Sequence, residues 1–229
     1  LLDPNGSMAL AMITVGFEQQ RRFFGDYRDL LGRSHPLRRE VIEAIATVLR
    51  LYNTAVWENR FIVGGVVEQI IGSSARALGF AVRNAGKSNQ GYDLQLSGDP
   101  VVGISVKGAF AKKQGGTINL INLRKKDGQL TQAEAAKRWS SATIFVIAGV
   151  GIGYADHEQI PDLVISTADA IQIKGEDLAS WWRSNPEWLI DADVPVKPKG
   201  PTVRVASDAV SLDVFADFSQ LGAYWEREI

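Results

Sequence analysis

The stretch GYDLQLSGDPVVGISVKG, residues 91–108, is the part of the chain that most constrains its fold. Residues 92–96 alternate between polar and apolar side chains, as a half-buried strand does. The SGDP sequence that follows is rich in turn-forming residues, and residues 101–106 then form a second strand-like run. The stretch therefore predicts two neighbouring strands joined by a short turn.

These two strands place an acid and a lysine near each other. Ser105 and Lys107 lie two residues apart, so they share one face of their strand while Val106 points away. Asp93 lies on the neighbouring strand, from which it can face the same cavity. Phosphodiester hydrolysis with magnesium requires oxygen ligands for the ion and a charged group near the scissile phosphate. The acid and the lysine, with the Val106 carbonyl as a further ligand, are suited to that chemistry.

The segment before this stretch is predicted to be helical. Apolar residues recur at helical spacing over residues 17–31, 41–52 and 60–78. The sequence SHP at residues 34–36 supplies a cap and a first-turn proline for the second helix, and Gly79 is a natural stop for the third. We therefore expect three helices ahead of the first strand.

The remainder of the chain mixes strands and helices. The run TIFVIA at residues 143–148 is continuously apolar, which is typical of a central buried strand. The sequence GVGIG at residues 149–153 is predicted to be a loop or turn, because no helix with the spacing of a dinucleotide-binding loop follows it. The other predicted strands are residues 80–82, 117–123 (with one irregularity) and 163–165, and the other predicted helices are residues 131–139, 176–183 and 215–227. The pattern predicts one α/β domain with a mixed central sheet flanked by helices.

Composition limits the kinds of site that the chain can build. It contains no cysteine, which excludes disulfides, thiolate zinc sites and cysteine nucleophiles, and its two histidines make a histidine-rich metal site difficult to build. No apolar run approaches the roughly 20 residues needed to cross a bilayer, so no membrane attachment is expected. The absence of cysteine fits a reducing, cytoplasmic location.

Charge is distributed unevenly along the chain. The net charge is −1, which argues against a uniformly basic nucleic-acid-binding protein. However, residues 107–138 carry eight basic and two acidic side chains, whereas residues 139–229 carry six basic and fourteen acidic ones. The basic segment begins at Lys107, so the local charge near the candidate site favours a phosphate-bearing partner. A solvated charged loop is the alternative interpretation of its Arg-Lys-Lys run.

The pattern Asp93 followed by Ser105-x-Lys107 resembles the PD-(D/E)xK nuclease superfamily, and within it the type II restriction endonucleases. The chain departs from the family pattern in two ways, because Ser105 replaces the second acid and Tyr92 replaces the proline before Asp93. The S-x-K form is similar to that of restriction endonucleases that recognise CCGG-type sites. The resemblance covers roughly residues 60–150. It implies a restriction-endonuclease-like core, Mg²⁺ as cofactor and double-stranded DNA as substrate of a homodimer.

In that group, a glutamate elsewhere replaces the missing carboxylate. Glu68 is our first choice, because it lies in an apolar stretch of the helix before the first strand. The alternative is that Glu68 is an ordinary surface residue of an amphipathic helix. Glu134 is the second choice, although its separation from Lys107 is long for the family pattern and Lys137 and Arg138 follow it.

The resemblance implies a role for each site residue. Asp93, Glu68 and the Val106 carbonyl would hold one or two Mg²⁺ ions. Lys107 would orient or help deprotonate the attacking water and offset charge on the transition state. Ser105 would position a water on the metal. Independently of the resemblance, the residues that precede Met8 suggest that residues 1–7 are a vector remnant, and they are set aside. The single nuclease domain then consists of a helical region (residues 8–79), the catalytic core (residues 80–150) and a C-terminal part (residues 151–229).

The expected DNA contacts lie around the site. Asparagine suits adenine in the major groove, and two asparagines lie on or beside an exposed strand face. The expected base contacts are Asn119 and Asn122, and the expected phosphate contacts are Lys112, Lys113, Arg124, Lys125 and Lys126. Three alternatives stay open: a repair, junction-resolving or modification-dependent nuclease of the same fold, a DNA-binding module with a degenerate site, and an α/β domain that is not a nuclease.

Overall fold

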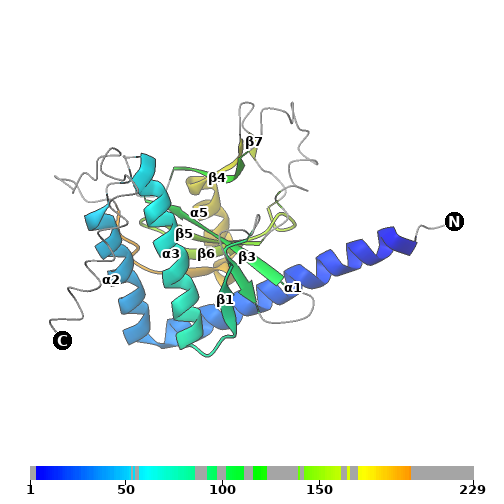
Figure 1. The fold of residues 1–229 in the computed structure, drawn as a ribbon, viewed down its shortest axis with the longest axis horizontal. Coiled ribbons are helices and arrows are strands. Elements are labelled where there is room, and N and C mark those ends of the chain that lie inside the picture. The colour runs from blue at the N-terminus through cyan, green and yellow to red at the C-terminus, as the bar shows by residue number, and fades with distance from the viewer. Residues whose placement is uncertain are drawn as a thin grey trace, which may run out of the picture.

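Three helices precede every described strand (Figure 1). They are α1 (Pro4–Arg33), α2 (His35–Leu51) and α3 (Trp57–Ala77), which confirms the helical expectation. The first helix begins at Pro4, within the seven residues that were set aside. The computed structural model describes residues 4–52, 54, 57–85, 92–96, 102–110, 116–122, 139, 142–160, 164–165 and 170–196.

The ends of these helices follow from local chemistry. Ser34 is the N-cap of α2 and proline lies in its first turn, although the Ser34 side chain makes no capping hydrogen bond. Gly79 ends α3 with φ of +90°, and the N–H groups of Gly79 and Phe80 donate to the carbonyls of Arg76 and Ala75. Because Phe80 belongs to this C-terminal motif, the strand predicted at residues 80–82 begins only at Val82. The predicted first residue of the strand was therefore wrong.

The central sheet has six strands in the order β1-β2-β3-β5-β6-β9. Their bounds are β1 (Val82–Asn84), β2 (Leu94–Leu96), β3 (Val102–Ala109), β5 (Ala142–Ile147), β6 (Gly151–Ala155) and β9 (Leu189–Asp191). β3 and β5 run parallel, and the other pairs are antiparallel. The expectation of an α/β domain with a mixed sheet is therefore confirmed. β5 is buried at all six positions, as its apolar sequence predicted.

A second, antiparallel sheet has the order β4-β8-β7. It consists of β4 (Thr117–Asn122), β8 (Ala170–Lys174) and β7 (Val164–Ile165). The predicted irregularity is present as a register shift between Asn119 and Ile121. The helix α5 (Gly175–Ser184) follows β8 directly, and a short 3-10 helix (Pro186–Trp188) leads into β9.

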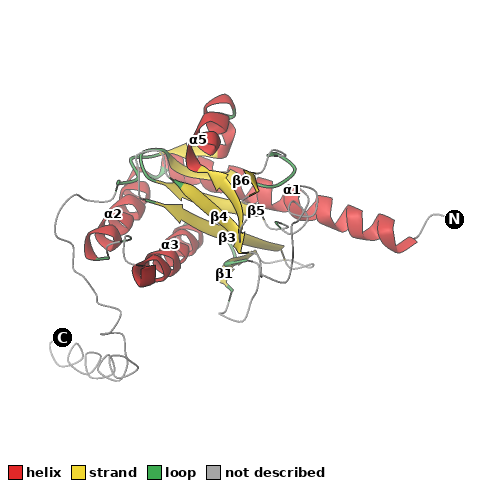
Figure 2. Cartoon of the chain, turned by 90° about the horizontal axis from the view of Figure 1, so that it is seen from above, coloured by secondary structure: helices red, strands yellow, loops and turns green. Residues whose placement is uncertain are grey.

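Helices lie on both faces of the central sheet (Figure 2). One core is formed by apolar residues of α1, α2 and α3 against one sheet face, including Phe24, Ile45, Val67 and Ile104. The other core lies under α5 and the second sheet, where Trp182 is completely buried. Val102, Ile104 and Val106 of β3 belong to the first core, so the residues between them face the opposite side of the strand. The edge of β3 is therefore a place where polar side chains from the two layers can meet.

One predicted loop contains a strand. A turn covers only residues 148–150, and Gly151 to Ala155 form β6, contrary to the expectation for the sequence GVGIG. A Cβ atom on Gly153 would lie 2.2 Å from Cζ2 of Trp182. The glycine is thus explained by the indole packed on the strand, not by a turn. The predicted helices at residues 131–139 and 215–227 lie outside the described residues, apart from Trp139, which is not helical.

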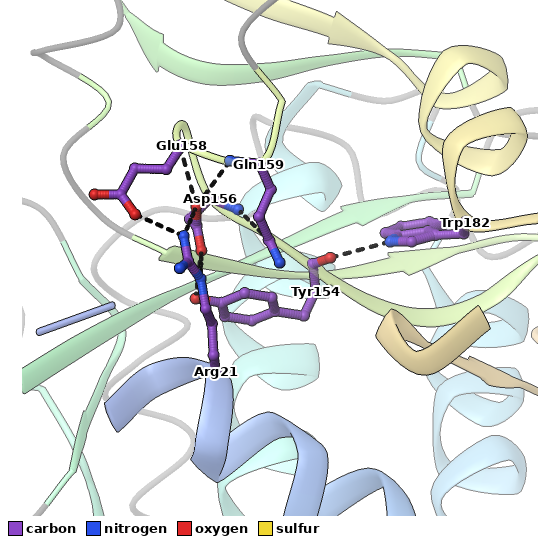
Figure 3. A network of polar contacts seen from close by, with 6 residues as sticks. All are labelled: Arg21, Tyr154, Asp156, Glu158, Gln159 and Trp182. Atoms are coloured by element: carbon purple, nitrogen blue, oxygen red, sulfur yellow. Dashed lines mark hydrogen bonds and ion pairs between the residues drawn. The ribbon is translucent and has the colours of Figure 1, made fainter. Parts of the chain in front are cut away.

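A buried carboxylate fastens α1 to the end of β6 (Figure 3). Arg21 donates two hydrogen bonds of 2.8 Å to the two oxygens of Asp156, whose side chain is fully buried. The Tyr154 hydroxyl donates to Asp156 at 3.0 Å, and the N–H groups of Glu158 and Gln159 each donate at 3.1 Å. Arg21 also pairs with Glu158 at 2.7 Å. Five donors thus satisfy this carboxylate within the protein.

No helix in the described part of the chain is both long enough and apolar enough to cross a bilayer.

Candidate functional site

Asp93 lies immediately before β2, at the point where the β2–β3 ladder ends. Its N–H donates to the Ile104 carbonyl at 3.0 Å. Its Oδ2 atom accepts a hydrogen bond of 2.8 Å from the Ser105 hydroxyl and one of 2.6 Å from the Val106 N–H. Two donors from β3 therefore fix the orientation of the Asp93 carboxylate. No donor in the described part of the chain reaches its other oxygen, Oδ1.

The strand lengths explain why this site exists. β2 pairs with residues 102–104 of β3, whereas β3 continues to Ala109. Beyond Ile104, the β2 side of β3 has no strand partner among the described residues. The Val106 N–H would continue the ladder, but it binds the Asp93 side chain instead. Because the N–H and C=O of one strand residue project to the same side, the Val106 carbonyl also points toward Asp93.

Lys107 extends the polar edge of β3. Ile104 and Val106 are buried against the three N-terminal helices, so Ser105 and Lys107 belong to the opposite face of the strand. Ser105 is 7% exposed, whereas Lys107 is partly exposed. The lysine can therefore retain contact with solvent or a ligand while its stem lies on the sheet. The prediction that 105 and 107 share a face, with 106 pointing away, is confirmed.

Glu68 approaches this edge from α3. Its neighbours Val67 and Ile71 are buried in the helical core, which places Glu68 at the border between α3 and the sheet. Burial is the largest cause that raises the pKa of Glu68 to about 7; the nearby charge of Asp93 raises it further and Lys107 opposes the shift. Glu68 therefore shares one electrostatic environment with both other charged residues. Glu68 is thus a half-buried residue of α3.

These groups form a small set of hard oxygen donors. It comprises the carboxylates of Asp93 and Glu68 and the Val106 carbonyl. Within the described residues, no three acidic, histidine or cysteine side chains gather as a metal cluster. Mg²⁺ is commonly held by only one or two carboxylates, with water and substrate phosphate completing its shell. Two carboxylates and one carbonyl are enough for an Mg²⁺ ion that keeps water and phosphate ligands. They are too few for a site in which the protein supplies every ligand. Glu134, the second choice for the missing acid, lies outside the described residues.

The predicted DNA contacts are only partly described. Asn119 is exposed on β4, and its Oδ1 accepts a hydrogen bond of 2.8 Å from Nε2 of Gln172 on β8. Gln172 was missed from the sequence because β8 was not predicted. Asn122 is the last residue of β4, and its side chain lies outside the described part. The same is true of the predicted phosphate contacts Lys112, Lys113, Arg124, Lys125 and Lys126.

The site thus combines two interacting carboxylates, a fixed backbone carbonyl and an ammonium group at one sheet edge. Carboxylates and the carbonyl can hold a divalent cation, and the ammonium group can balance charge on a phosphate. Comparisons of the chain with protein-family models, curated proteins and solved structures gave no match.

Proposed function

We propose that this protein is a magnesium-dependent endonuclease that hydrolyses phosphodiester bonds in double-stranded DNA. The observation that carries the proposal is the electrostatic coupling of Glu68 to Asp93 and Lys107, at an edge of β3 that pairs with no strand in the described part of the chain. Perturbed carboxylates beside a cationic side chain are a common mark of a reactive site. The mixed sheet with helices on both faces is compatible with a restriction-endonuclease-like core.

The residues can be given separate tasks. Asp93 is held through Oδ2, so Oδ1 is the oxygen that would hold a cation, together with Glu68 and the Val106 carbonyl. When bound, Mg²⁺ supplies positive charge at the phosphate and acidifies water. Lys107 contributes a second positive charge, which orients the attacking water and stabilises the negative charge that develops on phosphate oxygens.

Ser105 has a second task in this proposal, besides positioning a water on the metal. Its hydroxyl donates to Asp93 and so orients that ligand. Partners of this kind typically change metal affinity or activity 10–100-fold when they are removed. This accounts for a serine at a position where the family pattern has an acid. Glu68 then supplies the second carboxylate.

Protonation of Glu68 opposes cation binding. Its pKa of about 7 means that near neutral pH about half of the metal-free molecules hold a proton on this carboxyl. A cation between Glu68 and Asp93 would replace this proton and remove the repulsion between the carboxylates. The proposal therefore requires that apparent Mg²⁺ affinity and cleavage rise between pH 6 and 8.

We further propose a sequence-specific, type II restriction endonuclease that acts as a homodimer. Cutting both strands needs two active sites, and a two-fold dimer matches a palindromic sequence. The exposed Asn119–Gln172 pair offers amide groups suited to reading adenine. Discrete fragments from a plasmid would support sequence specificity, whereas dependence on branched or modified substrates would favour the related nucleases.

A DNA-binding module without cleavage is the second candidate. It is favoured by the absence of a third acidic ligand among the described residues. Digestion of a sequenced plasmid with and without Mg²⁺ separates the two candidates. The endonuclease should cut only with the ion, and a binding module should retain the plasmid without nicking it.

Two substitutions test the catalytic assignment. Asp93→Ala and Lys107→Ala should each abolish Mg²⁺-dependent cleavage and leave the circular dichroism spectrum unchanged. Asp26→Ala is a matched control, because Asp26 is exposed on α1 and should cut like the wild type. Full cleavage by either site variant would refute the assignment.

A further inference from the structure

A pocket of about 310 Å³ lies beside the candidate site. It is enclosed by the first two turns of α3, the C-terminal end of β3 and the start of β4. Its polar and small lining residues include Thr54, Arg60, Gly64, Gly108, Gly116 and Thr117. At about 30 Å³ per water molecule, it holds roughly ten waters. The pocket is therefore large enough for a polar group of a ligand.

The pocket continues directly from the candidate site on two elements. On β3, Gly108 follows Lys107. On α3, Arg60, Gly64 and Glu68 are spaced four residues apart, so they lie along one face of the helix. With a rise of 1.5 Å per residue, Gly64 and Arg60 lie about 6 and about 12 Å from Glu68 along the helix axis. A ligand at the site that extends along α3 would enter the pocket.

The charge of the pocket favours an anion. Arg60 is the charged residue among the lining residues described, and it is exposed. Its Nε donates to the Thr54 carbonyl at 2.9 Å, which orients the guanidinium group. Arginine presents several donors in a planar fork that matches phosphate oxygens. Thr117, exposed at the start of β4, adds a hydroxyl group on the facing wall.

The glycine at position 64 is not explained by packing. A Cβ atom there would meet nothing within 4 Å in the described part of the chain, so packing among those residues does not require a glycine. Glycine inside a helix is also less favourable than alanine. Gly108 differs, because a Cβ on it would lie 2.4 Å from Cε2 of Phe110. The open wall at Gly64 leaves room for a close approach by the backbone of a ligand.

We propose that this pocket binds a phosphate of the DNA strand about two to four nucleotides from the bond that is cut. This subsite rests on the proposed endonuclease function. This number of nucleotides follows from the separation of about 6–12 Å between Glu68 and the pocket and from the rise of about 3.4 Å per nucleotide along a strand. Arg60 neutralises the phosphate, and Gly64 gives the strand access to it. The subsite positions the strand and does not read its sequence.

Two variants and one matched control test the subsite. Arg60→Gln should weaken binding of a fluorescent 30-base-pair duplex about tenfold and reduce the slope of log K against log[salt] by about 0.9, the value for one phosphate contact. Gly64→Ala should weaken binding while its urea midpoint stays equal or rises. Gly65→Ala is the control, because its Cβ also meets nothing within 4 Å but Gly65 does not line the pocket. It should bind DNA like the wild type.

The outcomes separate the subsite from the nuclease. If the wild type cuts plasmid with Mg²⁺ while Arg60→Gln and Gly64→Ala bind and cut equally well, the subsite is refuted and the nuclease stands. If the wild type binds with an Arg60-dependent salt slope but never cuts, the nuclease is refuted, and the pocket stands only as a phosphate-binding site of a DNA-binding module. If the wild type neither binds nor cuts DNA, both are refuted. Should Gly64→Ala not fold, Arg60→Gln alone decides.

Discussion

Replacing Glu68 with glutamine should stabilise the metal-free protein at alkaline pH. An ordinary glutamate has a pKa of 4.5, and burial beside Asp93 raises that of Glu68 to about 7. Each pH unit between these values corresponds to about 1.4 kcal/mol, so ionising Glu68 in the folded protein costs at most about 3 kcal/mol. Glu68 is partly exposed, and solvent screening reduces the expected penalty to about 1–2 kcal/mol.

The direction of the pH dependence follows from proton binding. Between pH 4.5 and about 7, the folded protein keeps a proton on Glu68 that the unfolded chain has released. The free energy of unfolding therefore falls as pH rises through this window. Below pH 4.5 both states are protonated and the penalty is absent; above pH 7 it is complete. Glutamine is neutral throughout, so Glu68→Gln should exceed the wild type by about 1–2 kcal/mol at pH 8.5 and match it near pH 4.5.

Urea unfolding at pH 4.5, 6 and 8.5 in the presence of a chelator measures this difference. Glu43→Gln is the matched control, because Glu43 is exposed on α2 and its weak pairing with Arg39 spans 3.8 Å. The control should change stability by less than about 0.5 kcal/mol at each pH. A Glu68→Gln difference that does not change with pH, or a destabilised variant at pH 8.5, would refute the electrostatic coupling.

If the proposed function is right, Mg²⁺ should remove the stability advantage of Glu68→Gln over the wild type at pH 8.5. At ten times its dissociation constant, an ion that binds only the folded state stabilises it by about 1.4 kcal/mol. The wild type should gain this amount at pH 8.5. Glu68→Gln should gain much less, because it lacks the second carboxylate. Equal stabilisation of both proteins would place the ion elsewhere.

Three further substitutions test the site and its framework. Ser105→Ala removes a donor to Asp93 and should lower Mg²⁺-dependent cleavage 10–100-fold in initial-rate assays; an unchanged rate would exclude the orienting role. Asp156→Ala removes the acceptor of five hydrogen bonds, including two from Arg21 and one from the buried Tyr154 hydroxyl. It should destabilise the fold by about 3–5 kcal/mol in urea, and a loss below about 1 kcal/mol would contradict this. Gly79→Ala should lower the free energy of unfolding by about 1–2 kcal/mol, because Gly79 has φ of +90°. No side chain in the described part of the chain would contact the added Cβ, so the cost comes from the backbone conformation alone. A stability equal to the wild type would show that the helix end can rearrange.

The order of the elements was largely predictable, because long helices and fully buried strands have strong periodic signals. The strands that were missed or misplaced have local reasons. Gly153 makes β6 resemble a turn, yet the glycine is required by the indole of Trp182. β8 and β9 are short, and β9 follows a 3-10 helix with no change in composition to mark it. Packing between distant segments determined these strands, and a single sequence does not show such packing.

The site was predictable in its members but not in its hydrogen bonds. The period of a strand placed Ser105 and Lys107 on one face, and the period of a helix would equally have placed Arg60 on the face of Glu68. The contact of Ser105 with Asp93 depends on where the β2–β3 ladder ends. That end is set by the tertiary fold. The orienting contact of Ser105 with Asp93 was therefore not part of the sequence-based expectation.

Two carboxylate sites in this protein show what distinguishes a structural acid from one suited to a ligand. Asp156 accepts five hydrogen bonds, two of them from a guanidinium, so its charge is balanced within the fold. Asp93 accepts two hydrogen bonds, both on Oδ2, and its charge acts on Glu68, where it adds to the effect of burial. The positive charge of Lys107 offsets only part of this rise in the pKa of Glu68. Among the described residues, Arg21 balances the charge of Asp156, whereas Glu68 and Asp93 interact with the single cation Lys107. A divalent cation with a phosphate ligand would supply what is missing, so the chelator and magnesium experiments on Glu68 test the central premise of the proposed function.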